Sequence, residues 1–199
     1  MKKIIMIVVS VLVVISIILV VAYFFFREPS LSEIKQGFTK YLVEEKGSTK
    51  LVVVETKEFF SFPLTTKAIV GSIGISTVEV STWAHIEYYI DFEDQNAWSI
   101  EKRDKRLILS TPAIKVLPSS IMTDQIKGEI KDSSIFIDEQ KFIEEAKKAL
   151  PMWVAQQAGD PESIQKVKNQ ARDSLNKFFT GFLKKLNYKF DNIEIHIKD

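Results

Sequence analysis

The stretch Val78–Phe92, VEVSTWAHIEYYIDF, decides the fold that this sequence predicts. Its residues alternate between an apolar and a polar face over the whole stretch. The first face holds Val78, Val80, Thr82, Ala84, Ile86, Tyr88, Ile90 and Phe92, and the second holds Glu79, Ser81, Trp83, His85, Glu87, Tyr89 and Asp91. Successive side chains of a strand point to opposite faces of a sheet, so this alternation predicts a long strand with one face on the core.

The segments around this strand predict a sheet. Residues 50–62 (KLVVVETKEFFSF) are rich in β-branched and aromatic residues, which favour strands. Shorter strands are predicted at 98–100 and 106–109, with the charged turn KRDKR at 102–106 between them. Residues 112–118 form an extended piece between two prolines, 126–137 alternate weakly, and 188–198 alternate again with Ile193, Ile195 and Ile197 inward.

Three segments have helical periodicity. Ser30 and Glu33 have the spacing of a capping box, so residues 30–47 predict a helix that Gly47 ends. Asp138 caps a second helix, in which Pro151 predicts a kink and Gly159 the end. Asp160 and Pro161 begin a third helix, with Phe178, Phe179 and Phe182 on its core face. Its solvated face is predicted to carry Lys166, Lys168, Lys177, Lys184 and Lys185.

These elements predict an α+β fold over residues 48–199. Its sheet is mostly antiparallel, and two consecutive C-terminal helices pack on it. The apolar face of the strands and the apolar face of the helices must each be buried against another layer. A sheet covered by helices buries both.

An apolar run precedes this domain. Residues from Ile4 to Phe26, IIMIVVSVLVVISIILVVAYFFF, carry no charge, Gly or Pro. A helix of this length measures roughly 35 Å, enough to cross a hydrocarbon layer of ~30 Å. We therefore expect a transmembrane anchor at 4–26, a basic tail at 1–3 and a membrane-proximal helix at 30–47. No long linker separates the anchor from the domain.

A cleaved signal peptide is the alternative reading of this run. Signal peptides have a shorter apolar core and small residues at the cleavage site, whereas this run ends in Tyr23 and three phenylalanines. A retained signal-anchor in a bacterial cytoplasmic membrane is expected. The count of flanking Lys and Arg is nearly balanced, but a short basic tail before a long apolar run favours an extracytoplasmic domain.

Composition excludes several classes of function. The chain has 27 Lys and Arg against 26 Asp and Glu, a net charge of +1, and therefore lacks the basic excess of a nucleic-acid-binding domain. It has no Cys, which excludes disulfides, Cys-ligated zinc and thiol nucleophiles. No phosphate-binding glycine loop and no G-x-S-x-G motif occurs, so we expect no cofactor and no catalysis.

The chain resembles the bacterial single-pass membrane proteins grouped as the domain-of-unknown-function 4230 family. The likeness covers most of residues 30–187 and is carried, beside the apolar run, by KLVVVET at 50–56, VEVSTWAHIEYYIDF at 78–92, RLILSTPAIKVLP at 106–118, KDSSIF at 131–136 and the paired late helices. This family has no assigned activity, so the resemblance implies an arrangement and no chemistry. The strand AHIEYYI at 84–90 is also similar to stomatin and prohibitin domains, whose long coiled-coil tail is missing here.

Two groups of polar residues contain side chains of the types that bind metal ions. Asp91, Glu93 and Asp94 follow the main strand with calcium-like spacing, but the turn lacks the glycine and final glutamate of a calcium loop, so a solvated acidic turn is expected. His85 and His196 lie on the polar phases of distant strands, which predicts surface histidines.

The most unusual stretch of the domain is 59–78, FFSFPLTTKAIVGSIGISTV, whose single charged residue is Lys67. It is either a hairpin that pairs with the long strand or an apolar contact for a membrane or a partner. The contact residues would be Phe59, Phe60, Phe62, Leu64, Ile69, Val70, Ile73 and Ile75.

The sequence thus favours a membrane-anchored extracytoplasmic scaffold or interaction protein. Its partners would be the lipid bilayer and either another protein or further copies of itself, with no nucleic acid. Two alternatives stay open. One is an envelope hydrolase that uses Asp91, Glu93, Asp94 or His85, and the other is a lipid- or small-ligand-binding module with a cavity under the two helices.

Overall fold

The computed structural model describes residues 12–19, 28–67, 75–117, 120–133 and 138–199. The anchor predicted from Ile4 to Phe26 lies mostly outside these ranges, and its described part, 12–19, is helical. Within the described ranges, no helix has both the length and the hydropathy that crossing a bilayer requires.

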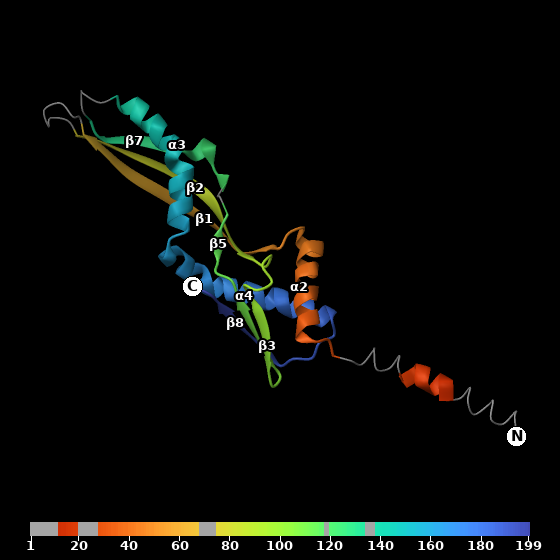
Figure 1. Cartoon of the computed structure of the whole chain (residues 1–199). Coiled ribbons are helices and arrows are strands. Elements are labelled where there is room, and N and C mark those ends of the chain that lie inside the picture. Colours follow the sequence, from red (N-terminus) through yellow and green to blue (C-terminus); the bar gives the residue numbers. More distant parts are fainter. Residues whose placement is uncertain (1–11, 20–27, 68–74, 118–119, 134–137) are drawn as a thin grey trace, which may run out of the picture.

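A long hairpin forms the first sheet (Figure 1). Strand β1 (Lys50–Lys67) pairs antiparallel with β2 (Ile75–Asp91) along its full length, with one register shift between Val52 and Val54. The opposite edge of β2 pairs in turn with β5 (Lys115–Val116), β6 (Ser120–Ile121) and β7 (Lys127–Asp132), each antiparallel. At about 3.3 Å per residue, the 18 residues of β1 extend over roughly 60 Å.

A second sheet lies beside the open end of the hairpin, where β1 begins and β2 ends. Strand β3 (Ser99–Arg103) pairs antiparallel with β4 (Arg106–Thr111), and β4 pairs in parallel with β8 (Asn192–Ile197). The predicted α+β fold, with an antiparallel sheet and two C-terminal helices, is confirmed. The strands form two sheets and not one, because the C-terminal strand pairs with β4. Ile193, Ile195 and Ile197 are buried beside β4.

The helices begin and end close to their predicted bounds. Helix α2 (Leu31–Lys46) has the capping box of Ser30 and Glu33, and Gly47 ends it in the left-handed conformation at φ 68°. Helix α3 (Glu139–Ala158) is capped by Asp138 and contains Pro151, where the kink stays a prediction. Helix α4 (Pro161–Lys185) follows from the Asp160 cap, and a 3₁₀ turn, η1 (Thr123–Gln125), precedes β7.

The helices divide the molecule into an arm and a base. Helix α3 lies along β2 and β7 (Figure 1). We call the unit formed by the β1–β2 hairpin, β7 and α3 the arm. Helix α4 packs on β1 and β8, and α2 packs on α4 and β3, which forms the base. The start of α2 and the β3–β4 turn lie at one end of the elongated body, and the outer part of the hairpin lies at the other (Figure 1).

The alternation of β2 is confirmed, since Val78, Val80, Thr82, Ala84, Ile86, Tyr88, Ile90 and Phe92 are all completely buried. One predicted surface residue is not at the surface. Lys168 on α4 is 8% exposed, and its Nζ pairs with the Asp199 carboxylate near the C-terminus. The prediction that Lys168 lies on the solvated face was wrong, because the residues after β8 bring the Asp199 carboxylate to its ammonium group.

Candidate binding groove on the arm

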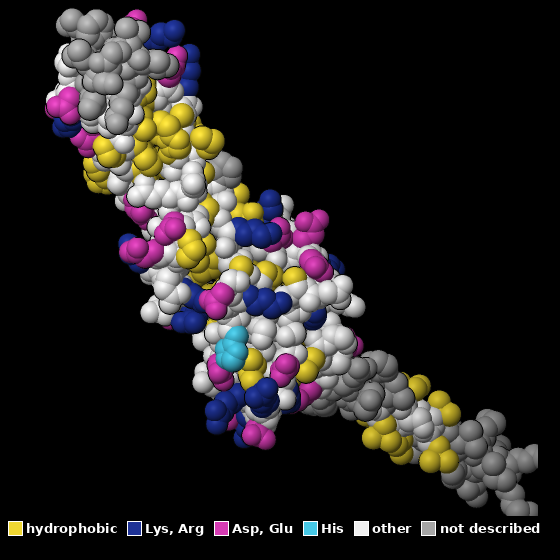
Figure 2. Space-filling model, turned by 60° about the vertical axis from the view of Figure 1, so that its left-hand side comes forward, with side chains coloured by type: hydrophobic (Ala, Val, Ile, Leu, Met, Phe, Trp, Pro, Cys, Tyr) yellow, Lys and Arg dark blue, Asp and Glu magenta, His cyan; other side chains and the backbone are white. Residues whose placement is uncertain are grey.

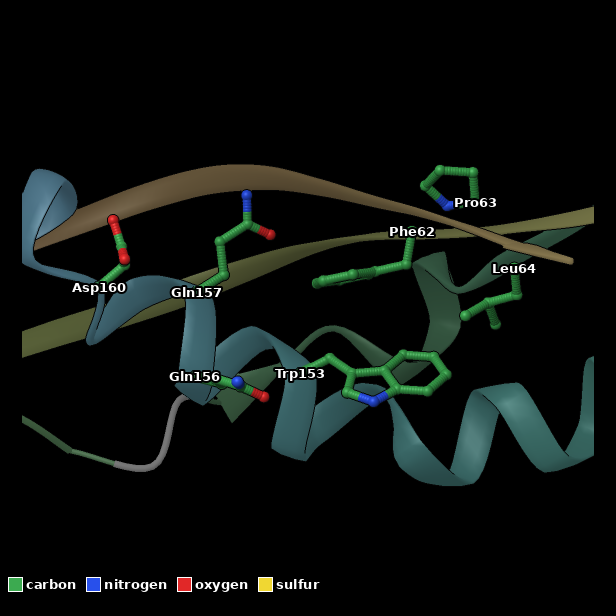
Figure 3. A pocket seen from close by; sticks show the side chains of 7 residues that line it. All are labelled: Phe62, Pro63, Leu64, Trp153, Gln156, Gln157 and Asp160. Atoms are coloured by element: carbon green, nitrogen blue, oxygen red, sulfur yellow. The ribbon is translucent and has the colours of Figure 1, made fainter.

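A groove lies on the arm between the outer half of β1 and the C-terminal half of α3 (Figure 3). Its volume is about 410 Å³, and it is lined by Phe62, Pro63, Leu64, Trp153, Gln156, Gln157 and Asp160. We call these seven residues the arm groove. Small-molecule and peptide pockets begin at roughly 300 Å³, so the hollow is large enough to hold side chains of a ligand.

Local structure explains how these residues meet. Phe62 and Leu64 are two positions apart on β1, so they point to the same face of the sheet. Trp153, Gln156 and Gln157 are three and four positions apart on α3 and therefore share one face of the helix. Figure 3 shows the rings of Phe62 and Trp153 next to each other. Their centroids are 5.6 Å apart with a tilt of 44°.

The groove has an apolar and a polar end. Phe62, Leu64 and Trp153 are half-buried, so each offers part of its apolar surface to the groove. At the other end Gln156, Gln157 and Asp160 are exposed. The Asp160 carboxylate accepts a hydrogen bond from the Glu162 N–H at 3.1 Å as the cap of α4. Amide side chains donate and accept hydrogen bonds, as a peptide backbone requires.

The free edge of β1 runs beside this groove. In the part of the chain that the structure describes, β1 pairs with β2 alone, so its other edge has no partner strand. Pro63 lies on this strand, where a proline is tolerated because edge positions need not donate to a ladder. An unpaired edge beside apolar pockets is the arrangement that accepts an added strand from another chain.

The predicted contact stretch is divided between two faces. Phe62 and Leu64 line the arm groove, whereas Phe60 is buried in the core. Phe59 is 54% exposed on the opposite face, where its ring lies 5.4 Å from that of Trp83. Ile75 begins β2, and the predicted contacts Ile69, Val70 and Ile73 lie outside the described residues.

The acidic turn is held by its own hydrogen bonds. One oxygen of Asp91 accepts from the Thr49 hydroxyl at 3.3 Å and from the Glu93 N–H at 3.0 Å. Asp94 accepts from the Asn96 N–H at 2.8 Å. Glu93 and Asp94 are exposed, and the described residues contain no cluster of three or more His, Cys, Asp or Glu side chains suited to a metal ion.

The two histidines lie on different sheets. His85 is exposed on β2, and His196 on β8 contacts Glu194, with 2.6 Å between the ring Nε2 and the carboxylate. This hydrogen bond is the main reason why the pKa of Glu194 is lowered. His85 is six residues from Asp91 along the same strand, roughly 20 Å away. The hydrolase candidates Asp91, Glu93, Asp94 and His85 therefore do not converge.

The lipid- or small-ligand-binding alternative places its cavity under the two C-terminal helices. Between the helices and the sheets, Leu150, Val154, Leu175 and Phe179 are completely buried. The arm groove, by contrast, lies at the surface. Sequence periodicity placed Trp153 in the apolar stripe of α3, but no signal in the sequence paired it with Phe62.

Tyr88 is a buried phenol whose hydroxyl has no hydrogen-bond partner among the described residues. Burial, helped by the charge of Glu58, raises the pKa of Tyr88 from 10.0 to about 12. Above pH 10 the unfolded chain therefore loses this proton before the folded chain does. The contribution of the protonated Tyr88 to the free energy of unfolding is fully present below pH 10 and is lost as the pH rises toward 12.

Tyr88→Phe is expected to remove this part of the alkaline loss of stability. Urea unfolding of the full chain in detergent, followed by circular dichroism at several pH values, measures it. Tyr89→Phe, the half-buried neighbour on the other face, is the matched control. An alkaline loss in Tyr88→Phe as steep as in the original chain would show that another group titrates.

Comparison with known proteins gives one match. A family model described as "Protein of unknown function (DUF4230)" matches residues 46–194, which is more than half of the chain. The search of curated proteins and the search of solved structures found no significant match. The matched range runs from β1 to the first half of β8 and includes helices α3 and α4 and the arm groove. On this match, the chain belongs to the DUF4230 family of proteins of unknown function.

Proposed function

We propose that this protein is a single-pass membrane-anchored interaction protein without catalytic activity, whose arm groove binds an extended segment of a partner protein. The observation that carries the proposal is the position of Phe62, Leu64 and Trp153 beside the unpaired edge of β1. A partner strand on this edge would gain backbone hydrogen bonds, and its apolar side chains would enter the groove.

The shape of the body supports this role. The outer part of the arm lies at the end of the body opposite α2, the first helix after the apolar run (Figure 1). With 4–26 in a bilayer, the arm would hold its groove at a distance from the lipid. This geometry favours a protein partner over the anchoring membrane as the ligand of the outer hairpin.

The hydrophobic side chains on the arm supply a further argument. Figure 2 shows such side chains gathered on the arm below the grey tip, on the face in view. Phe59 and Trp83, which are 54% and 40% exposed, form an aromatic pair on the opposite face of the arm from the groove. Clusters of exposed aromatic residues are typical of protein contacts, since rings bury much area at low entropic cost.

Site-specific photo-crosslinking in membranes tests the proposal. A photoreactive amino acid replaces Gln156 at the rim of the groove, and the control replaces the exposed Lys148 on the same helix. A protein adduct is expected at 156 and not at 148. Trp153→Ala should weaken the adduct about tenfold or more, as truncation of a central aromatic residue does. Met152→Ala, one position away and 64% exposed, should leave it unchanged.

Each other result has a defined meaning. An adduct of two identical chains would identify a second copy as the partner segment, and lipid adducts alone would favour the lipid-binding alternative. An adduct that persists in Trp153→Ala would contradict binding in the groove.

The extracytoplasmic position is tested separately. The chain contains no Cys, so Met152→Cys introduces a single thiol on the arm. A membrane-impermeant maleimide should label it in intact cells. Labelling only after permeabilisation would place the arm in the cytoplasm.

A further inference from the structure

Two charged segments far apart in the sequence meet at the end of the body opposite the outer hairpin. One is the β3–β4 turn, KRDKR at 102–106, and the other is the connection from α4 to β8, KKLNYKFD at 184–191. The Asp191 N–H donates to the Lys105 carbonyl at 2.9 Å, and the Lys102 Nζ lies 5.4 Å from the Tyr188 ring centroid. We call these two segments the basic end surface.

This surface carries more positive charge than the rest of the chain. Its basic residues are Lys102, Arg103, Lys105, Arg106, Lys184, Lys185 and Lys189, against two acids, Asp104 and Asp191. Neighbouring glutamates pair with Lys102, Arg103 and Lys185. Among the described residues, Lys105, Lys184 and Lys189 have no ion pair, although the whole chain has a net charge of only +1. The surface therefore keeps an excess of exposed cations.

Glu28, which follows the apolar run in the sequence, lies next to this surface. The carboxylate of Glu28 lies 3.1 Å from the Lys102 Nζ, and Glu28 also lines a hollow of about 690 Å³ with Lys105, Lys184 and Lys189. Phe26, the last residue of the run, precedes Glu28 by two positions. Two residues of chain extend over at most about 7 Å, so a bilayer that holds residues 4–26 must lie close to the basic end surface.

The same connection also exposes apolar groups. Leu186, between Lys185 and Asn187, is 39% exposed, and Phe190 is half-buried at the hollow. Lysines that alternate with exposed aliphatic and aromatic residues suit the boundary between headgroups and acyl chains, because the stems and rings are apolar and the ammonium groups stay in water.

We infer that the basic end surface rests on anionic phospholipid headgroups of the bilayer that holds residues 4–26. The inference rests on the membrane anchor of the proposed function. This contact would orient the body, because a base that lies flat on the lipid makes the arm project away from the bilayer. Attraction of basic residues by anionic lipid supplies the force.

Fluorescence quenching in nanodiscs tests this contact with the full chain. The chain has no Cys, so a dye is attached to a single introduced thiol. Gly181→Cys places it on α4 one turn before Lys184, where an added Cβ meets nothing within 4 Å. Met152→Cys on the arm is the distant control. The quencher is a nitroxide on the lipid headgroup, with one chain in each nanodisc.

Quenching at 181 is expected to be strong in phosphatidylglycerol and weak in phosphatidylcholine, and to fall at high salt. Lys184→Gln with Lys189→Gln should weaken the contact equilibrium about 25-fold, at about fivefold for each lysine. Lys127→Gln with Lys148→Gln removes the same charge from the arm and should change nothing. The dye at 152 should stay unquenched.

Equal quenching at 181 in both lipids, unaffected by the lysine variants, would overturn the inference, because the tether alone would then explain the proximity. Quenching that requires two chains in a nanodisc would also overturn it and would assign the surface to a second copy. Failure of the chain to enter nanodiscs, or its release from membranes by alkaline carbonate, would instead overturn the anchor of the proposed function.

Discussion

Phe38→Ala is expected to lower the free energy of unfolding by about 3–5 kcal/mol, the range for loss of a fully buried phenylalanine. Phe38 on α2 is completely buried. Its ring meets the rings of Phe92, Trp98, Phe179 and Phe182 edge to face, at centroid distances of 5.0–5.5 Å. One side chain therefore joins α2, the end of β2, the start of β3 and α4, and its removal leaves a cavity among four elements.

Urea unfolding of the full chain in detergent, followed by far-ultraviolet circular dichroism, measures this loss. Val43→Ala on the same helix is the control, since Val43 is 48% exposed and its truncation should change stability by no more than about 0.5 kcal/mol. A loss below about 1 kcal/mol for Phe38→Ala would mean that the aromatic cluster does not hold α2 on the base.

Gly128→Ala is expected to destabilise the arm by about 1–3 kcal/mol, the usual cost of overpacking. Gly128 lies on β7 under α3, and an added Cβ would stand 2.6 Å from the Ile143 Cγ2. Ile143 is buried and branched at Cβ, so this methyl group cannot swing away without a change of rotamer. Either β7 or α3 must move.

A double-mutant cycle separates this contact from the general effect of a lost glycine. In an Ile143→Ala background the obstructing methyl group is absent. Gly128→Ala should then lower the free energy of unfolding only slightly. Gly181→Ala on α4 is the second comparison. It meets nothing within 4 Å and should stabilise its helix by about 0.5–1 kcal/mol. Additive effects of the two substitutions on the arm would contradict direct packing between Gly128 and Ile143.

Much of the secondary structure was predictable because its signals are local. The alternation of 78–92 and the capping box of Ser30 and Glu33 each act within a few residues, and both are present in the structure. The Phe178, Phe179 and Phe182 stripe was also correctly assigned to the core, since a period of 3.6 residues reports one helix face.

The arrangement of the strands was less predictable. The alternation of 192–197 is the same whether that strand joins the hairpin or pairs with β4. Its parallel pairing with β4 depends on contacts between segments far apart in the sequence. The burial of Lys168 has the same origin, because its partner Asp199 is brought to it by the path of the chain after β8.

For each candidate site, the sequence singled out some of the residues, and only the structure showed which residues they lie beside. Phe62 and Leu64 stood out from the sequence as part of an apolar stretch with a single charge. Their partner Trp153 is far away in the sequence and looked like any other residue of an apolar stripe. The basic end surface was likewise visible only as two separate charged segments, each of which reads as a solvated loop.

The sequence by itself determined the long strand at 78–92 with its buried face and the three helices of the domain with their N-caps, because hydrophobic periodicity and capping act over a few residues. Only the tertiary structure decided that the strands form two sheets, that a groove joins β1 to α3 and that 102–106 lies beside 184–191. Such contacts depend on which surfaces remain unpaired after the local elements have formed, and no short-range pattern in the chain encodes that choice.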